Sequence, residues 1–460
     1  ANAPEGIKTL PMTGMKDEYQ FTMTVSALDC TGCGSCANVC PGKKGAKALA
    51  MENLEANMGE QKYFDYGVTL PVKEDVIAKF KETTVKGSQF KQPLLEFSGA
   101  CAGCGETPYA KLITQLFGDR MYIANATGCS SIWGNSSPST PYTVNAKGQG
   151  PAWGNSLFED NAEFGYGMLL AQKAIRDGLK AKIEDVVANG DNADVKAAGQ
   201  EWLDTFACGA TNGAATEKLV AALEACGCDK AKDILTQKDF LAKKSQWIFG
   251  GDGWAYDIGF GGVDHVLASG RDINVMVFDT EVYSNTGGQS SKSTPTGAIA
   301  QFAAGGKETK KKDMASIAMS YGYVYVAQIS MGADFNQAIK AIAEAEAYPG
   351  PSLIIAYAPC INHGIKKGMS KAQTEEQLAV ECGYWNNFRF NPAAEGAKFT
   401  LDSKEPKMEG YKDFLNGEVR YNSLARFYPE KAEVLFAKNE SEAKDRYEYL
   451  KKLVTLYGAE

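Results

Sequence analysis

Two polar residues, Asp252 and Thr280, each close an apolar run in a pattern that could bind a cation. Asp252 lies in WIFGGDG, and Thr280 follows INVMVFD, with a helix-like stretch at 257–269 between them. Strand, glycine turn, helix and strand form a βαβ unit, so both residues should lie where α/β sheets bind ligands. Glycines let backbone N–H groups approach phosphate oxygens, and Mg²⁺ prefers hard oxygen ligands. The pattern predicts a Mg²⁺–phosphate site, with a plain βαβ turn as the alternative.

A second kind of chemistry is indicated by the cysteines, of which there are twelve, beside only two histidines. The first four follow the C-x₂-C-x₂-C-x₃-C-P pattern of bacterial ferredoxins, which binds [4Fe–4S] clusters: Cys30, Cys33, Cys36 and Cys40. Zinc is the alternative. In two-cluster ferredoxins the fourth cysteine of such a run ligates the other cluster, and residues 1–29 contain no second run. Either one cluster uses all four thiols or the chain begins inside a ferredoxin domain; we favour the second interpretation.

Four further cysteines lie at predicted element boundaries, and their thiolates could meet at one edge of a sheet. They are Cys101, Cys104, Cys129 and Cys360, of which the first two form a C-x₂-C. Four thiolates from three loops suit one [4Fe–4S] cluster. Cys208, Cys226 and Cys228 fall in a helical stretch, and we interpret them as buried or incidental thiols, because C-x-C is the wrong spacing for a cluster.

Composition limits the class of protein. The chain has 460 residues, 44% of them hydrophobic and 23% charged, which fits two or three globular domains. A net charge of −8 argues against nucleic acid and anionic membrane surfaces. Twelve cysteines in a chain this long are not the disulfide framework of a small secreted domain. No signal peptide begins at Ala1, and no apolar run is long enough to span a bilayer. We therefore predict a cytoplasmic protein.

The elements that must position these residues alternate between strand and helix. A connecting helix is expected at 74–85, an N-cap at Thr107 with Pro108 first in the helix, a strand at 121–127, and helices almost without a break over 161–244. Residues 130–160 and the Ser/Thr/Gly-rich stretch to 312 should be loops, the latter either a surface linker or an active-site cover. Helices at 313–321, 333–347 and 370–384, strands at 323–330 and 351–359, and a helix from about 430 follow.

The predicted fold class is therefore α/β. A doubly wound parallel sheet with a helical insertion at about 165–244 should occupy residues 75–457, after part of a ferredoxin-like α+β domain at 1–74. The glycine turn with Thr280 resembles the diphosphate-binding motif of thiamine diphosphate (TPP) enzymes, in which Val282 would supply a backbone carbonyl. Thr280 stands where most of those enzymes have Asn, and Ser284-Asn285 replaces their paired Asn.

The whole chain resembles the 2-oxoacid:ferredoxin oxidoreductases, specifically those that use pyruvate with ferredoxin or flavodoxin. The matching segments are ALDCTGCGSCANVCP, GACAGCGETPYAKL, ATGCSSIWG, GGDGWAYDIGFGG, FDTEVYSNTGGQ and APCINHG. The resemblance implies oxidative decarboxylation of pyruvate to acetyl-CoA and CO₂, with electrons passing through [4Fe–4S] clusters. It also implies a C-terminal portion of the enzyme, a homodimer, and inactivity of this chain without its N-terminal part, which would supply the carboxylate that activates the cofactor.

Residue roles follow from the same resemblance. Asp252, Thr280 and Val282 would hold Mg²⁺, and Asn285 would act as the catalytic residue by hydrogen bonding to the substrate. Glu106 would either reach the cofactor or remain a solvated carboxylate. The other residues implied in cofactor binding are Cys129, Gly251, Gly253, Trp254, Glu281, Tyr283 and Ser284. Two alternatives remain open: an enzyme for another 2-oxoacid such as 2-oxoglutarate, and an iron–sulfur electron-transfer module that binds no TPP.

Overall fold

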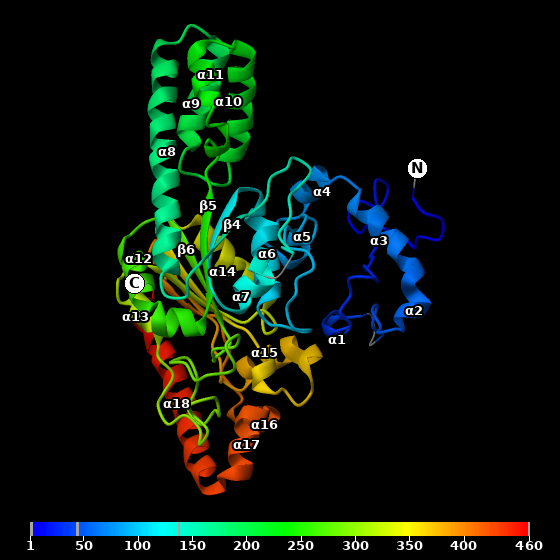
Figure 1. Ribbon diagram of the computed structural model, residues 1–460, viewed down its shortest axis with the longest axis vertical. Helices are drawn as coiled ribbons and strands as arrows, with labels where there is room; N and C mark the ends of the chain where they lie inside the picture. The colour runs from blue at the N-terminus through cyan, green and yellow to red at the C-terminus, as the bar shows by residue number, and fades with distance from the viewer. Residues whose placement is uncertain (1–2, 43–45, 137–138, 459–460) are drawn as a thin grey trace.

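The computed structural model describes residues 3–42, 46–136 and 139–458, and Ala1, on which the prediction about the chain start rested, lies outside them. The chain forms a central sheet with helices on both faces, a helical projection, and a separate N-terminal segment beside the sheet (Figure 1). A long helix near the C-terminus runs down one side of the sheet (Figure 1). This arrangement is the α/β class expected from the alternation of strand and helix patterns.

The central sheet has eight strands in the order β10-β9-β7-β8-β6-β5-β3-β4. The six strands from β7 to β4 are parallel, β9 pairs antiparallel with β7, and β10 pairs antiparallel with β9. Their bounds are β3 Met121–Ala126, β4 Ala152–Ser156, β5 Ser245–Gly251, β6 Ile273–Asp279, β7 Tyr325–Ile329, β8 Pro351–Tyr357, β9 Phe388–Phe390 and β10 Phe399–Leu401.

Alternate residues of the central strands pack on opposite faces of the sheet, which is why these strands are apolar throughout. On one face, Phe249 and Phe278 join a core with helices α6 (Thr107–Phe117) and α14 (Phe335–Ala347). On the other, Ile248 and Val277 pack with α12 (Phe260–Ala268) and α13 (Met314–Met319). Helices on both faces of a mainly parallel sheet confirm the doubly wound fold.

The strand register brings four strand ends to one edge. Asn125 pairs with Phe249, Gly251 with Phe278, and Phe278 with Ala356. Because these strands are parallel, the residues that follow β3, β5, β6 and β8 all leave the sheet on the same side. The predicted residues of the TPP and proximal cluster sites lie at the end of one of these strands, in the segment that follows it, or in the loop before α6.

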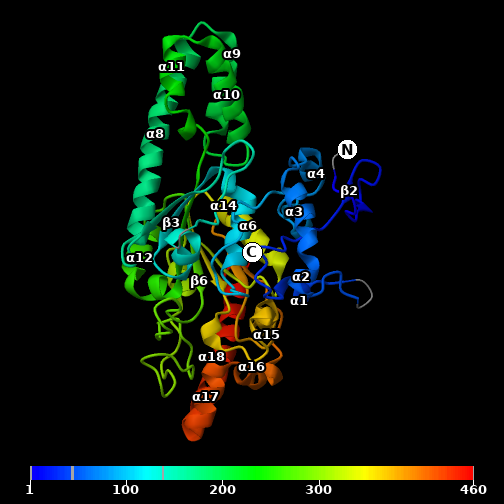
Figure 2. The same cartoon turned by 45° about the vertical axis from the view of Figure 1, so that its right-hand side comes forward.

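The helical insertion is a bundle that projects from the sheet, as two views show (Figures 1 and 2). It consists of α8 (Asn161–Asn189), α9 (Ala193–Thr205), α10 (Asn212–Cys226), α11 (Asp229–Leu235) and the turn η4 (Lys238–Phe240). A separate core centred on Trp202, Leu219 and Leu223 holds it together. The first turns of α8 pack on the sheet, so the insertion shares that helix with the main domain.

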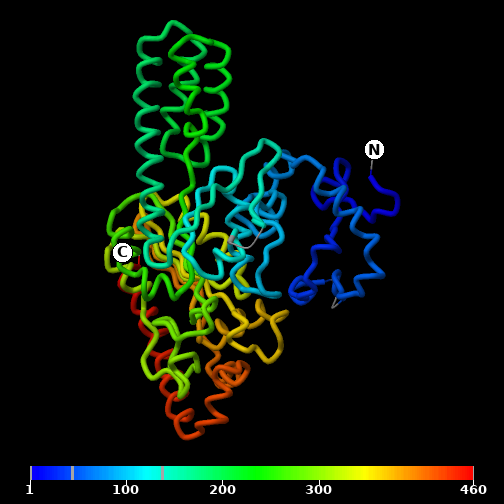
Figure 3. The backbone as a smooth tube through the Cα atoms, viewed as in Figure 1, coloured from blue at the N-terminus to red at the C-terminus, as the bar shows by residue number. Residues whose placement is uncertain are grey.

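The N-terminal segment lies beside the sheet domain (Figure 3). The elements of its described residues, 3–42 and 46–88, are short. They are β1 Leu10–Pro11, β2 Gln20–Phe21, α1 Ser35–Val39, α2 Leu54–Asn57, η1 Met58–Glu60, α3 Gln61–Val68, α4 Glu74–Lys79 and α5 Val85–Ser88. Asn38 Nδ2 of α1 donates to Thr374 Oγ1 at 2.9 Å, and Lys371 also bonds Asn38. This contact fixes α1 against the sheet domain, while the domain boundary near residue 74 stays a prediction.

The C-terminal part is mostly helical. It contains η6 Ile361–His363, η7 Met369–Lys371, α15 Ala372–Glu381, η8 Met408–Gly410, α16 Tyr411–Gly417, α17 Val419–Phe427 and α18 Pro429–Leu456. The amphipathic helix expected from about 430 is α18, which buries Leu450 and Leu453 against the sheet domain. None of the helices in the described ranges has the length and apolar character needed to cross a bilayer.

Several element predictions need correction. The stretch 130–160 contains strand β4, whose Gly and Asn residues hid its pattern, the end of α7 (Cys129–Ser131), and η3 (Ile132–Ser136). A short turn, η2 (Gly118–Arg120), lies before β3. The helix expected at 74–85 ends at Lys79, and α6 begins at Thr107 with Glu106 as its N-cap. A π-helical turn, η5 (Gly253–Ile258), precedes α12 where a loop was expected. Strands β9 and β10 and helices α16 and α17 were missed because each is short.

A matched pair of glycines in α8 tests the contact between insertion and sheet. A Cβ added at Gly165 would lie 2.5 Å from Ile248 Cγ1, whereas none of the described atoms lies within 4 Å of one added at Gly167. We expect Gly165→Ala to lower the free energy of unfolding by about 1–3 kcal/mol through overpacking. Gly167→Ala should raise it by about 0.5–1 kcal/mol through helix propensity. Urea denaturation measures both, and equal effects would contradict the packing.

Candidate active site at the carboxyl edge of the sheet

Three oxygen ligands predicted for Mg²⁺ come together after β5 and β6. Thr280 Oγ1 lies 2.9 Å from Asp252 Oδ1 and 3.0 Å from the Val282 carbonyl oxygen. Neighbouring oxygens around an octahedral Mg²⁺ with bonds of about 2.1 Å are about 2.9–3.0 Å apart. The set is therefore spaced as adjacent ligands of one Mg²⁺ would be, and all three donors are of the hard kind this ion prefers.

The Asp252 carboxyl group is fully buried and lies beside a second buried carboxylate. Burial and the charge of Asp279 raise the pKa of Asp252 to about 8, although Ser291 and Thr280 donate hydrogen bonds to it. Asp279 is itself held by Tyr256 Oη at 2.9 Å and Lys311 Nζ at 2.9 Å. A divalent cation would reverse this pKa shift, because a nearby positive charge favours the carboxylate. The electrostatics of the turn therefore suit a bound cation.

The glycine turn is shaped by the aromatic residues around it. A Cβ at Gly253 would lie 2.6 Å from the Tyr283 ring, so the close approach requires glycine there. At Gly251 such an atom would meet only Phe278 O, at 3.9 Å, so this backbone is open to a ligand. The Trp254 side chain is fully buried in the core below the turn. Trp254 thus supports the turn from inside.

The loop after Thr280 presents the remaining predicted residues. Tyr283 is half-buried, and its backbone N–H donates to Gln289 O at 2.9 Å. Ser284 Oγ lies 3.1 Å from Cys129 Sγ, and Asn285, the predicted catalytic residue, is exposed. The structure thus leaves Asn285 free to meet a ligand, and its role stays a prediction.

Glu281 has a strained backbone and a carboxylate that points away from this loop. Its φ is 60°, a conformation that non-glycine residues rarely adopt and that costs about 1–3 kcal/mol. Its carboxylate pairs with Lys311 at 2.9 Å and Arg420 at 2.9 Å and accepts from Tyr384. Burial alone would raise its pKa, but these cations lower it to about 2. The ion pairs hold the chain in the conformation that directs the Val282 carbonyl towards Thr280.

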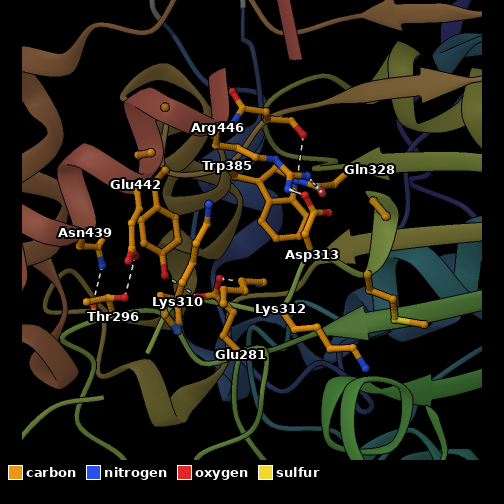
Figure 4. Close-up of a pocket in the computed structure, with 18 of the residues that line it drawn as sticks. Glu281, Thr296, Lys310, Lys312, Asp313, Gln328, Trp385, Asn439, Glu442 and Arg446 are labelled. Carbon is orange, nitrogen blue, oxygen red and sulfur yellow. Dashed lines mark hydrogen bonds and ion pairs between the residues drawn. The ribbon is translucent and has the colours of Figure 1, made fainter. Parts of the chain in front are cut away.

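Glu281 also separates two hollows. One, shown in Figure 4, has Lys310, Lys312 and Trp385 among its lining residues. The other, with a volume of about 640 Å³, is lined by residues that include Val282, Gly288, Asn362 and Arg420. Of the three predicted Mg²⁺ ligands, Val282 lines this second hollow.

The second cysteine set gathers at the same edge. Gly105 N donates to Pro359 O at 3.1 Å, so the Cys101–Cys104 loop lies directly on the segment that leads to Cys360. A Cβ at Gly105 would lie 2.6 Å from Pro359 N. Burial has the largest effect on the Cys129 thiol and raises its pKa. The negative charges of Glu106, Cys360 and Cys101 raise it further. Ser284 joins two of these thiols, because its hydroxyl lies 3.1 Å from Cys129 Sγ and its carbonyl accepts from Asn362, whose N–H donates to Cys360 Sγ.

Donors surround several of these sulfur atoms. The N–H of Glu106 donates to Cys104 Sγ at 3.5 Å, and that of Asn362 donates to Cys360 Sγ at 3.5 Å. Such bonds tune the potential of iron–sulfur clusters. In the part of the chain that the structure describes, no three Cys, His, Asp or Glu side chains are close enough to hold a single metal ion. A cubane carries its thiolates on four separate iron atoms, so its ligand set is wider than that of one ion.

Glu106 is buried, which removes the alternative of a solvated carboxylate. Its Oε2 accepts from Trp133 Nε1 at 2.7 Å, while burial raises its pKa to about 7. Glu106 lies near enough to Cys104, Cys129 and Cys360 to affect the pKa of each. A protonatable carboxyl group therefore lies between the cysteine set and the sheet edge.

Sequence reasoning missed the loop that links the two predicted sites. His363 Nε2 donates to Thr280 O at 2.7 Å, and Asn362 Nδ2 donates to Ser284 O at 3.2 Å. His363 is buried, and burial lowers its pKa to about 3, so the imidazole is neutral. The signal was available, because His363 is one of only two histidines and follows Cys360 by three residues.

The first cysteine set lies against the second. Cys30 and Cys36 are exposed, Cys33 and Cys40 are partly exposed, and Ala48 N donates to Cys40 Sγ at 3.3 Å. Burial opposes ionisation of Cys33, but bonds from Ser35 and the Gly103 N–H lower its pKa. The ferredoxin-like loop and the Cys101–Cys104 loop also pack on one segment, because a Cβ at Gly34 would lie 3.3 Å from Ser370 Cβ and one at Gly103 would meet the Met369 backbone.

Comparison with known proteins agrees with this geometry. Residues 225–356 match the family described as "Thiamine pyrophosphate enzyme, C-terminal TPP binding domain". Over 99% of this chain's length, the sequence is 57% identical to the pyruvate-flavodoxin oxidoreductase of Enterobacter agglomerans. Over 98% of this chain's length, it is 57% identical to the pyruvate:ferredoxin oxidoreductase of Moorella thermoacetica. Over nearly its whole length the chain is therefore similar to a part of these pyruvate oxidoreductases. Each alignment covers 39% of the relative, so the chain spans about two fifths of the length of these relatives.

More distant relatives differ in their named electron acceptor. The pyruvate dehydrogenase [NADP(+)] of Cryptosporidium parvum is 44% identical over 98% of this chain and 26% of its own length. Among solved structures, a 2-oxoglutarate:ferredoxin oxidoreductase of Magnetococcus marinus covers 57% of this chain and is itself covered to 64%, with 15% identity and a TM-score of 0.33. The likeness to pyruvate oxidoreductases therefore rests on the sequence relatives.

Tyr109 ties the helix after the C-x₂-C loop to the strand before Cys360. Its hydroxyl donates to Tyr357 O at 2.9 Å and accepts from Met331 N at 2.9 Å, and it also lies 3.1 Å from Glu376 Oε2. All these groups are buried, so the bonds have no replacement in water. This network holds the two cysteine-bearing loops in register.

We expect Tyr109→Phe to lower the free energy of unfolding by about 1–3 kcal/mol, because it leaves buried backbone groups unpaired. Tyr142→Phe is the matched control, since the buried Tyr142 hydroxyl has no hydrogen-bond partner among the described residues. That change should be neutral or slightly stabilising. Urea denaturation of both variants measures the difference, and equal losses would show that the Tyr109 bonds contribute nothing.

Proposed function

We propose that this chain supplies the diphosphate half of a TPP site and a neighbouring [4Fe–4S] site to an enzyme that oxidatively decarboxylates pyruvate. The observation that carries the proposal is the spacing of Asp252 Oδ1, Thr280 Oγ1 and the Val282 carbonyl at the strand edge where four cysteines also gather. Its products would be acetyl-CoA and CO₂, with coenzyme A as second substrate and ferredoxin or flavodoxin as electron acceptor. The names of the relatives support the pyruvate and acceptor assignments.

The residues of this chain would act by binding and placement. Asp252, Thr280 and Val282 hold Mg²⁺, and Gly251 exposes its backbone to the diphosphate. Bound TPP supplies a thiazolium ring that acts as an electron sink for decarboxylation. Glu106 holds a proton in the buried space beside Cys129, and Asn285 is free to hydrogen bond with the substrate. Glu281, through its ion pairs, keeps the Val282 carbonyl in position.

Electron flow would follow the contacts between the cysteine loops. Cys101, Cys104, Cys129 and Cys360 would hold the cluster next to TPP, and Cys30, Cys33, Cys36 and Cys40 would bind clusters farther out. The packing of Gly34 on Ser370 and of Gly103 on the neighbouring Met369 brings the two loops close and supports transfer between the two sets. We further propose that a separate N-terminal part of the enzyme completes the cofactor site and that the whole is a cytoplasmic homodimer.

Asp252→Asn should abolish retention of TPP and Mg²⁺, because the amide keeps the size of the carboxyl group but supplies no negative charge to the ion. The purified 460-residue chain is incubated with Mg²⁺ and TPP, gel-filtered, and assayed for bound thiamine. Asp257→Asn is the control, since that carboxylate lies in the same turn but pairs with Lys292 at 2.9 Å. Equal thiamine content in the wild type and Asp252→Asn would refute the cofactor site and favour an electron-transfer module.

Cys360→Ser should remove the cluster next to TPP while leaving TPP binding unchanged. A serine hydroxyl is a poorer iron ligand than a thiolate, so iron content should fall by about one cluster after anaerobic reconstitution. Cys382→Ser serves as control because Cys382 is buried in the core away from the set. Unchanged iron content and an unchanged EPR spectrum would identify Cys360 as a structural thiol.

A further inference from the structure

Two cysteines of the helical insertion lie together, outside every site described above. Cys226 ends α10 and Cys228 is the N-cap of α11, with Gly227 between them at φ 60°. Cys226 Sγ donates to Cys228 Sγ at a distance of 3.1 Å. Of the two interpretations of these thiols, buried or incidental, the first is wrong, because Cys228 is exposed and Cys226 is partly exposed.

This turn lies at the end of the insertion that is far from the sheet. Lys230 pairs with Asp185 near the C-terminus of α8 at 2.6 Å, whereas the turn between α9 and α10 contacts Arg120 beside the sheet. The bundle stands away from the rest of the molecule in both views (Figures 1 and 2). The dithiol is therefore open to small molecules and remote from the proposed cofactors.

The geometry suits a disulfide. The left-handed conformation of Gly227 folds the chain back so that both sulfur atoms lie on one side. A disulfide bond is about 2.05 Å long, so the two sulfurs need to approach by only about 1 Å. In the described parts of the chain these two thiols have no third ligand that would complete a metal site. The pair is thus suited to oxidation.

One of the two thiols is the more reactive. A hydrogen bond from Cys226, followed by bonds from backbone groups that include the Ala231 N–H, lowers the pKa of Cys228. The thiolate is the nucleophile in disulfide exchange. Cys226 packs partly against the core of the insertion, beside the residues that hold α10 and α11 together. Cys228 is therefore the attacking thiol and Cys226 the resolving one.

We propose that Cys226 and Cys228 form a redox-active dithiol that low-molecular-weight disulfides oxidise reversibly to an internal disulfide. Cys228 thiolate attacks one sulfur of the reagent, breaking its S–S bond and releasing one thiolate. The Cys226 sulfur then attacks the Cys228 sulfur and releases the second half of the reagent as a thiolate. The proton of the Cys226 thiol passes to that thiolate. The dithiol loses two electrons and the reagent gains them, yielding two free thiols. This inference is independent of the proposed function.

Peptide mass spectrometry of the whole 460-residue chain tests the proposal. The reduced protein is incubated anaerobically with oxidised glutathione, quenched in acid, alkylated and cut with trypsin. Cleavage after Lys218 and Lys230 gives a peptide that contains Cys226 and Cys228 and no other cysteine. We expect this peptide to lose two hydrogen atoms, to resist alkylation and to regain both thiols with dithiothreitol.

Cys208 provides the internal control. It is exposed, and bonds led by the one from Thr211 lower its pKa, so it matches Cys228 in reactivity but not in having an adjacent thiol. Its peptide, 197–218, should carry glutathione or the alkyl group. A wild-type peptide 219–230 that keeps two alkylatable thiols, or carries two glutathiones, would overturn the proposal.

Single variants test the order of attack. Cys226→Ser should accumulate a stable glutathione adduct on Cys228, while Cys228→Ser should react about tenfold more slowly because it lacks the thiolate. Both changes lie on the surface of the insertion and should leave thermal unfolding unchanged. Equal reaction rates of the two variants would overturn the assignment of Cys228 as nucleophile, and the wild-type result stands whether or not the variants fold.

Discussion

The repulsion between two buried carboxylates, Asp252 and Asp279, is the constraint on which the site depends. Asp252 follows β5 and Asp279 ends the adjacent parallel strand β6 at matched register, and both are fully buried. Buried carboxyl groups require hydrogen-bond or charge partners, and the loop after Thr280 supplies them. Ser291 donates to Asp252, while Ser293 and Lys311 bind Asp279. The Ser/Thr/Gly-rich loop, which was expected to be either a surface linker or an active-site cover, thus folds inward and supplies partners to these carboxyl groups.

The same loop contains the residue of the site whose backbone is strained. Glu281 adopts a left-handed conformation, and its ion pairs with Lys311 and Arg420 offset the cost. Because Lys311 contacts both Asp279 and Glu281, the strand end and the strained residue share one cation. The Val282 carbonyl then lies where the oxygen of Thr280 can reach it. Positioning of a backbone ligand therefore depends on side chains far away in the sequence.

The two proposed cofactor sites are linked through a loop of four residues. Cys360 and His363 are separated by two residues, and His363 holds the Thr280 carbonyl while Asn362 holds that of Ser284. A displacement of the Cys360 loop would therefore move the predicted Mg²⁺ ligands as well. The neutral imidazole can make this bond without adding charge to an edge that already holds several carboxylates.

The sequence by itself determined the class of fold and the residues of the predicted cation and cluster sites, because strand periodicity, glycine turns and cysteine spacing are local signals. Asp252 and Thr280 could be placed together since the carboxyl ends of neighbouring parallel strands share one edge. Only the tertiary structure decided that Glu106 is buried, that Trp254 faces the core and that Glu281 turns away to Lys311 and Arg420. It also decided that Cys226 and Cys228 are adjacent and accessible. These features arise from contacts between residues distant in sequence or from backbone conformation, and neither leaves a periodic pattern in the chain.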